Sequence, residues 1–193
     1  MNNMNMKKRK ILIIAVLAIC FASMSAGSFA YFTYQDKAHN VITSGNVKIE
    51  VQEWADEDQT VSFPEEGVDG VLPGDKIVKI VEVKNVGSGD CWIRVKVEKN
   101  FQLAEGETGA PDTDVLKLDI DSENWTEQDG WYYYNSVLQA GETCQPLFRT
   151  VEFDPGMGNM YQKGVAAINI SAQAVQAANN GSSALEAAGW PED

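Results

Sequence analysis

Alternation of apolar and polar residues, repeated along most of the chain, constrains the fold more than any other feature. The clearest case is Cys91–Lys99, in which every second residue from Cys91 to Val97 is apolar. A period of two residues is typical of a β-strand that turns one face to a core. We therefore predict strands at Val47–Gln52, Ile77–Lys84, Cys91–Lys99, Val115–Ile120, Trp131–Leu138, Gln145–Phe153 and Gly164–Val175.

Turn signals separate these segments, and helical periodicity is nearly absent. Pro73-Gly74-Asp75, Gly87–Asp90 and Gln128-Asp129-Gly130 contain the residues that tight turns favour. About eight strands with turns between them predict an all-β, antiparallel β-sandwich. In the last strand we expect one face to be lined by Ala166, Ile168, Ile170, Ala172 and Ala174.

Two segments add detail to this fold. Ser183 and Glu186 have the spacing of a capping box and Gly189 is a helix-ending residue, which predicts a short C-terminal helix. In the aromatic run Trp131–Tyr134, alternate side chains point to opposite faces of a strand. We expect one pair of these rings to fill the core and the other pair to lie on the surface.

The N-terminus has the three parts of a secretory signal peptide. A basic cluster at residues 7–10 precedes the apolar run Ile11–Ala22, and a segment of small residues follows. Ser28 and Ala30 fit the small positions before a cleavage site, which predicts a cut between Ala30 and Tyr31. The alternative is an uncleaved anchor, although serine and glycine dilute the second half of the stretch that would span a bilayer.

The charge of the mature chain limits the classes of partner that it can bind. The predicted cut removes four of the 15 basic residues and none of the 28 acidic ones, so the net charge falls from −13 to about −17 with His39 neutral. Phosphate contacts need clustered Lys and Arg, so we expect no nucleic-acid partner and no membrane partner after cleavage. Copies of such a chain repel one another in solution.

Several short motifs, in a fixed order, connect this chain to a known family. The aromatic pair Tyr31-Phe32 follows the predicted cut, and a Ser-Gly-Asn-Val segment opens the first strand. Further motifs are Leu72–Asp75, Lys84–Gly87 with Trp92–Val95, Trp131–Tyr134, Leu138–Glu142 with Pro146–Phe148, and Gln173–Ala177. In these residues the chain resembles the TasA/camelysin family of secreted proteins, which a dedicated, SipW-type signal peptidase matures.

The resemblance implies both a fold and a function. It implies a jelly-roll-like sandwich and a structural protein of the extracellular (biofilm) matrix or cell surface that forms fibres. The partners would be the dedicated signal peptidase, further copies of the chain, or a related matrix protein. An accessory or anchoring module for such fibres is one alternative, and a secreted metallopeptidase of the camelysin type is another.

The residue pattern argues against the peptidase. Zincin chemistry needs two histidines one helical turn apart with a glutamate between them, and this chain has one histidine, His39. The acidic pairs Asp112/Asp114 and Asp119/Asp121 lack the continuation of an EF-hand loop, so calcium is the less favoured interpretation. We predict no catalytic residue, no cofactor and no metal site.

The segment after the cut is a candidate for assembly. We divide the chain into a signal peptide at residues 1–30, an extended N-terminal segment at 31–46 and a β-sandwich domain at 47–193. The extended segment could donate a strand to the sheet edge of another copy, and such a contact propagates as a filament. The alternative is an ordinary frayed terminus. The side chains expected to contribute are Tyr31, Phe32, Tyr34, Val41 and Ile42.

Two cysteines remain in the mature chain, because Cys20 leaves with the signal peptide. Cys91 and Cys144 each follow a turn and begin a predicted strand. An even number in an exported chain is compatible with a disulfide. Two buried free thiols fit equally well, since Cys91 lies on the apolar face of its strand. The sequence leaves both alternatives open.

Overall fold

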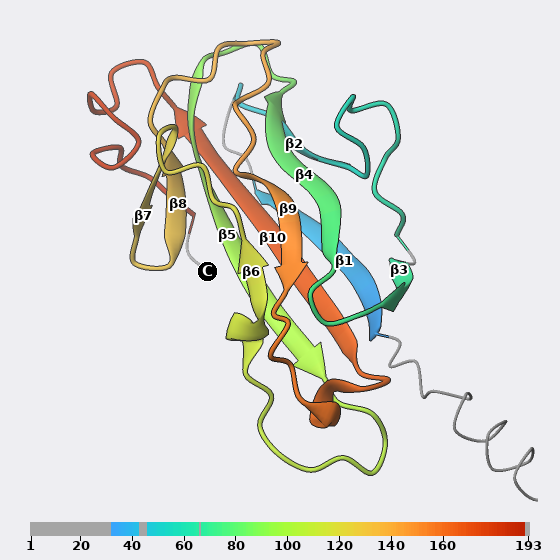
Figure 1. Cartoon of the computed structure of the whole chain (residues 1–193). Coiled ribbons are helices and arrows are strands. Elements are labelled where there is room, and N and C mark those ends of the chain that lie inside the picture. The colour runs from blue at the N-terminus through green and yellow to red at the C-terminus, as the bar shows by residue number, and fades with distance from the viewer. Residues whose placement is uncertain (1–31, 43–45, 66, 192–193) are drawn as a thin grey trace, which may run out of the picture.

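The structure, a computed structural model, describes residues 32–42, 46–65 and 67–191, with the backbone alone for 32–42, and folds them into two facing β-sheets (Figure 1). The predicted signal peptide, its cleavage residues Ser28 and Ala30, and Tyr31 lie outside the described residues. No helix in the described part of the chain is long and apolar enough to cross a bilayer.

The larger sheet has six strands in the order β3-β1-β10-β5-β8-β7. Its pairings are antiparallel except that of β1 with β10, which is parallel. The strands are β1 (Phe32–Ile42), β3 (Val68–Val71), β5 (Cys91–Gln102), β7 (Trp125–Gln128), β8 (Trp131–Tyr134) and β10 (Val165–Gln176).

The smaller sheet is antiparallel and has four strands in the order β2-β4-β9-β6. Two 3-10 turns, Thr113–Val115 and Asn159–Tyr161, lie in the connections. The strands are β2 (Ile49–Trp54), β4 (Lys76–Asn85), β6 (Leu116–Leu118) and β9 (Phe148–Phe153).

The predicted all-β sandwich is confirmed, and so is the alternation that led to it, but the predicted antiparallel arrangement fails at one pair, because β1 runs parallel to β10. Each predicted strand corresponds to an observed one, although the aromatic strand β8 ends early, at Tyr134. The predicted face of β10, from Ala166 to Ala174, is fully buried between the sheets. The turn before β8 is also confirmed, because Asp129 and Gly130 have φ values of 53° and 78°, the left-handed pair of a tight hairpin.

The predicted C-terminal helix is wrong. Only one turn closes there, through the Glu186 N–H and the Ser183 carbonyl (3.2 Å). The Glu186 carboxylate accepts instead from the Ser182 hydroxyl (2.5 Å), and the Asn180 side chain binds both the N–H and the carbonyl of Ala188 (2.8 and 3.0 Å). These bonds fold the segment into a compact loop, because a helix of one or two turns has little stability of its own.

The expectation that one aromatic pair lies on the surface is also wrong. Tyr132 and Tyr134 pack against the main core, as expected for one pair. Trp131 and Tyr133 are buried as well, at 6% and 7% exposure, in a second apolar cluster on the outer face of the six-stranded sheet. The chain after β10, residues 177–191, covers this face and supplies part of that cluster.

Candidate functional site

Strand β1 holds an unusual place in the sheet. Although it is the first strand of the chain, it lies between β3 and the last strand, β10 (Figure 1). Its backbone pairs in parallel with β10, from Thr33 opposite Val165 to Ile42 opposite Gln173. The register shifts once, between Lys37 and Asn40. Because β1 lies inside the sheet, its backbone pairs with a neighbouring strand on each side.

The parallel pairing has a consequence for how β1 is held in the sheet. A parallel neighbour cannot be joined to its partner by a tight turn, so β1 is held beside β10 by backbone pairing. On its other side, β1 pairs with β3 at Phe32 and Tyr34. On its other edge, β10 pairs with β5 along all twelve of its residues, from Val165 to Gln176. This pairing anchors β10 independently of β1.

The predicted assembly residues are placed only in part. Phe32, Tyr34, Val41 and Ile42 lie on the β1 backbone, but their side chains are outside the described residues, as is all of Tyr31. Their role in donating a strand therefore stays a prediction. The backbone pairing of the segment with β10 is the new observation.

The two cysteines are buried free thiols in the structure, which is the second of the two alternatives. The Cys144 sulfur accepts a hydrogen bond from the Val83 N–H (3.1 Å), and the Cys91 thiol donates to the Leu138 carbonyl (3.7 Å). Burial raises the pKa of each thiol to about 12. Both sulfurs are therefore protonated, and unreactive, at neutral pH.

Alkylation tests this state of the cysteines. Iodoacetamide at pH 8 is expected to leave the folded mature protein unmodified, because the thiolate is the nucleophile and both raised pKa values keep it scarce. After unfolding without reductant, mass spectrometry should find Cys91 and Cys144 both modified. A protein that takes up no reagent until it is reduced would carry the disulfide instead.

A buried ion pair was not predicted from the sequence. The Lys79 ammonium contacts the Glu53 carboxylate at 2.5 Å, and the two side chains are 0% and 4% exposed. The Phe63 ring covers the ammonium at 4.0 Å from its centroid. The alternation of β2 contained the signal, because Glu53 follows Ile49 and Val51 on the face that turns inward.

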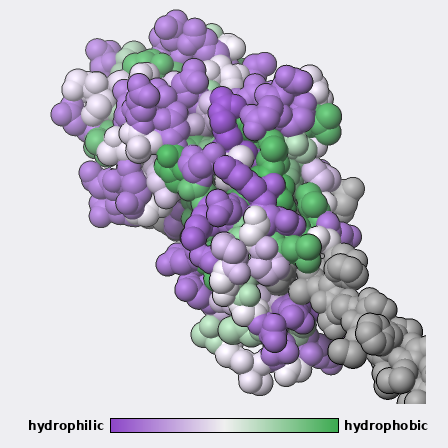
Figure 2. All heavy atoms as spheres, viewed as in Figure 1, coloured by the Kyte–Doolittle hydropathy of each residue, from purple (hydrophilic) through white to green (hydrophobic). Residues whose placement is uncertain are grey.

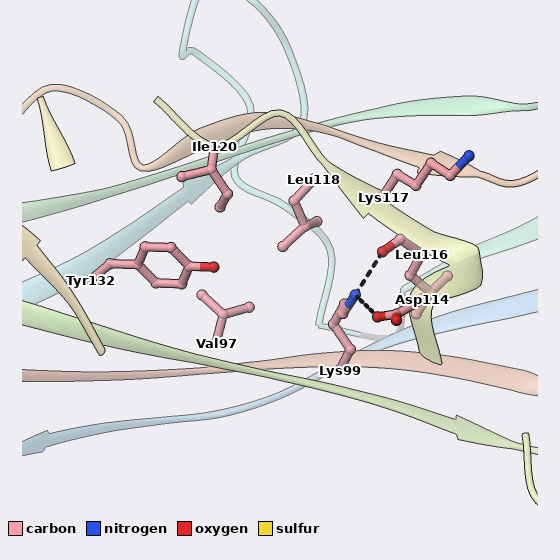
Figure 3. A pocket seen from close by; sticks show the side chains of 8 residues that line it. All are labelled: Val97, Lys99, Asp114, Leu116, Lys117, Leu118, Ile120 and Tyr132. Atoms are coloured by element: carbon pink, nitrogen blue, oxygen red, sulfur yellow. Dashed lines mark hydrogen bonds and ion pairs between the residues drawn. The ribbon is translucent and has the colours of Figure 1, made fainter. Parts of the chain in front are cut away.

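A groove of about 480 Å³ opens between β6 and strands β5 and β8 (Figure 3). Lys99 crosses it and donates to the Leu116 carbonyl and to Asp114, both at 3.1 Å. The apolar side chains of the groove point toward one another, and none of its lining residues is a serine, cysteine or histidine. The groove is lined by Val97, Lys99, Asp114, Leu116, Lys117, Leu118, Ile120 and Tyr132.

The acidic residues that we considered as calcium ligands accept hydrogen bonds from nearby backbone and side-chain groups. Asp112 accepts from the Asp114 N–H (2.8 Å), and Asp119 accepts from the Thr150 N–H (2.7 Å). Asp121 binds the side chain of Asn124 (2.8 Å). Within residues 46–65 and 67–191, no three His, Cys, Asp or Glu side chains come together in a group that could hold a metal ion.

These observations define an all-β, two-sheet sandwich protein whose first strand pairs in parallel with its last. The sequence profile of one protein family, described as camelysin metallo-endopeptidase, matches residues 5–129. Because that match covers more than half of the chain, the protein belongs to the TasA/camelysin family. No curated protein and no solved structure matches the chain.

The name of this family implies a metal, and the described residues do not fit one. The described carboxylates form no group of ligands, and the two cysteines are protonated thiols in the core. His39 lies on β1, where only the backbone is described.

Proposed function

We propose that this protein is a secreted structural component of the extracellular (biofilm) matrix or cell surface, which assembles into fibres after its signal peptide is cleaved. One observation carries the proposal. Strand β1 fills an interior position of the sheet, next to the last strand, through pairs that a second copy could supply equally well. Membership of the TasA/camelysin family supports it.

Assembly would proceed by exchange of β1. Each copy inserts its β1 between β10 and β3 of the next copy, and its own gap receives the β1 of the previous one. The contact is heterologous and does not close on itself, so it extends into a filament. We describe the subunit as jelly-roll-like. The description is supported by the two facing sheets, in which strands far apart in the sequence are neighbours, in the orders β10-β5-β8 and β4-β9-β6.

Export and charge would control when assembly begins. Before cleavage, residues 31–42 are tied to the signal peptide and cannot reach a second copy. The mature chain carries a charge of about −17, and the face shown in Figure 2 is largely hydrophilic. Monomers therefore repel one another, and added salt is expected to speed fibre growth by screening that repulsion.

Processing is testable directly. N-terminal sequencing of the secreted protein is expected to begin Tyr-Phe-Thr-Tyr, because Ser28 and Ala30 satisfy the small-residue rule of signal peptidases. A secreted or cell-bound form that retains Ile11–Ala22 would contradict cleavage and place the chain among anchored proteins.

Purified mature protein separates the main proposal from the accessory module. Fibres that grow without any added partner support a building block. Growth only after adding a related matrix protein would assign the accessory or anchoring role. Negative-stain microscopy over a series of salt concentrations provides the readout.

The family description favours one second candidate, a secreted metallopeptidase. We propose that the chain is not an enzyme, since the ligand pattern of zincins is missing from its sequence. Casein cleavage that a chelator stops, and that survives replacement of His39, would establish the peptidase instead.

A further inference from the structure

The C-terminal tail, residues 177–191, lies across three neighbouring strands on the outer face of the six-stranded sheet. Ala184 and Ala187 are buried against Trp92 of β5, Trp131 and Tyr133 of β8, and Val175 of β10. The Trp92 ring N–H also donates to the Asn180 carbonyl (2.9 Å). The tail therefore contacts β10, β5 and β8 together.

Arg94 is the centre of this contact. It stands directly opposite Gln173 of β10 and Tyr133 of β8, so the three residues form one row across the sheet. Its guanidinium donates to the Gln173 side-chain oxygen (2.9 and 2.7 Å) and to the Tyr133 hydroxyl (3.1 Å). A single cation thus ties three strands together at one register position.

The tail closes over this row. The Arg94 guanidinium lies 4.1 Å from the ring centroid of Trp131 and 4.8 Å from that of Trp190, and it donates to the Pro191 carbonyl (3.3 Å). Trp190 also meets the Tyr133 ring edge to face, at 5.9 Å. Stacked, partly desolvated cations of this kind are among the stronger surface interactions.

The tail has a fixed shape of its own. Asn180 bonds to backbone groups of Gln176 and Ala188, which closes the loop between β10 and Trp190. Gly181 has φ +75°, and a Cβ there would lie 2.9 Å from the Glu186 backbone, so only glycine fits. Trp190 is therefore presented to Arg94 by a preformed loop.

The end of β10 that Arg94 contacts lies beside the last residue of β1. Gln173, which Arg94 holds, is the register partner of Ile42, the last residue of β1. When β1 is absent, this end of β10 keeps β5 on one edge and the tail on its outer face. A slip of one residue would turn the buried face of a strand outward, so an incoming strand needs β10 held in one register.

We infer that the C-terminal tail, acting through Arg94, is a clamp that reinforces the pairing of β10 with β5 and so holds β10 in register to receive the N-terminal strand of a second copy. This inference rests on the proposed function. Arg94 and Trp190 are positioning residues, since neither pairs with β1 itself. The clamp acts on the accepting side of a subunit and leaves the donated strand unchanged.

Fibre growth of Trp190→Ala in the full mature chain tests the clamp. We expect a folded monomer whose β10 amides exchange faster with deuterium, and whose fibres elongate roughly tenfold more slowly. Trp190→Phe, which keeps a ring over Arg94, should restore most of the rate. Leu185→Ala is the matched control, because Leu185 lies on the same tail but is 41% exposed.

A mixing experiment separates a clamp from general weakening. Trp190→Ala subunits can still donate β1, so a small fraction of them should shorten wild-type fibres by occupying ends that then grow slowly. If Trp190→Ala does not fold, Arg94→Lys replaces it, since lysine keeps the charge but loses the planar fork. Normal elongation by a folded Trp190→Ala or Arg94→Lys protein overturns the inference alone. A wild-type protein that forms no fibres overturns the proposed function, and the inference with it.

Discussion

A mature chain that lacks residues 31–40 is expected to form no fibres while remaining a folded monomer. The deletion removes most of β1, so no copy has a strand to donate. Folding should persist because other strands supply fully buried core residues, among them Val81, Ile93 and Phe148. The measurement is the fibre yield in negative stain together with the circular dichroism of the monomer.

A synthetic peptide with the sequence of residues 31–42 completes this test. Added to the wild-type protein it should slow fibre growth, because it fills the gap between β10 and β3 without extending the chain of subunits. A peptide of the same composition in scrambled order is the control. Fibres that form at the normal rate from the folded deletion variant would falsify the donor role of β1.

Lys79→Met is expected to lower the free energy of unfolding by about 3–5 kcal/mol. The substitution leaves the Glu53 carboxylate, 4% exposed, without the ammonium that it contacts at 2.5 Å. The penalty of an uncompensated buried charge exceeds the value of the pair itself. Denaturant unfolding of the mature monomer, with a constant slope against denaturant, gives the value.

The double variant Glu53→Leu/Lys79→Met decides whether charge is the reason. Replacing a whole buried pair by apolar residues is often neutral or stabilising, so most of the loss should be recovered. The control is Lys96→Ala, which removes an exposed ion pair. The Lys96 ammonium lies 3.7 Å from the Glu98 carboxylate, and the two side chains are 32% and 54% exposed. That change should cost less than about 1 kcal/mol. If Lys79→Met also lowered the free energy of unfolding by less than about 1 kcal/mol, the result would contradict the account.

The strands that alternation predicts are those whose two faces meet different environments. The strands β5 and β10 separate a dry core from an outer face, and the sequence shows this with a period of two. Strands β3 and β7 were missed, because each has four residues and only a single buried one. A strand that short leaves almost no periodic signal.

The remaining errors come from tertiary contacts that local patterns do not contain. The Ser183–Glu186 spacing suits a helix, but Asn180 and Trp92 bind the tail in another shape. The aromatic strand becomes buried on both faces because the tail returns over it. Likewise, the sequence indicates an extended N-terminal segment but not its parallel pairing with β10.

The position of the N-terminal segment in the sheet was not predictable from the sequence. The place of residues 31–46 after the predicted cleavage site predicts an assembly segment, and this stays a prediction. Only the topology shows that the neighbour of this segment is β10 and that Gln173 lies opposite Ile42. Register depends on the whole sheet, and residue types alone specify it poorly in a segment with polar residues at its centre.

Negative-stain microscopy of the cleaved protein beside the uncleaved precursor, at equal concentration and salt, tests the central claim most directly. The account predicts fibres from the cleaved protein and none from the precursor, whose residues 31–42 remain attached to the signal peptide. Adding the signal peptidase to the precursor should then start fibre growth. Equal fibres from both forms, or none from a folded cleaved protein at any salt concentration, would contradict it.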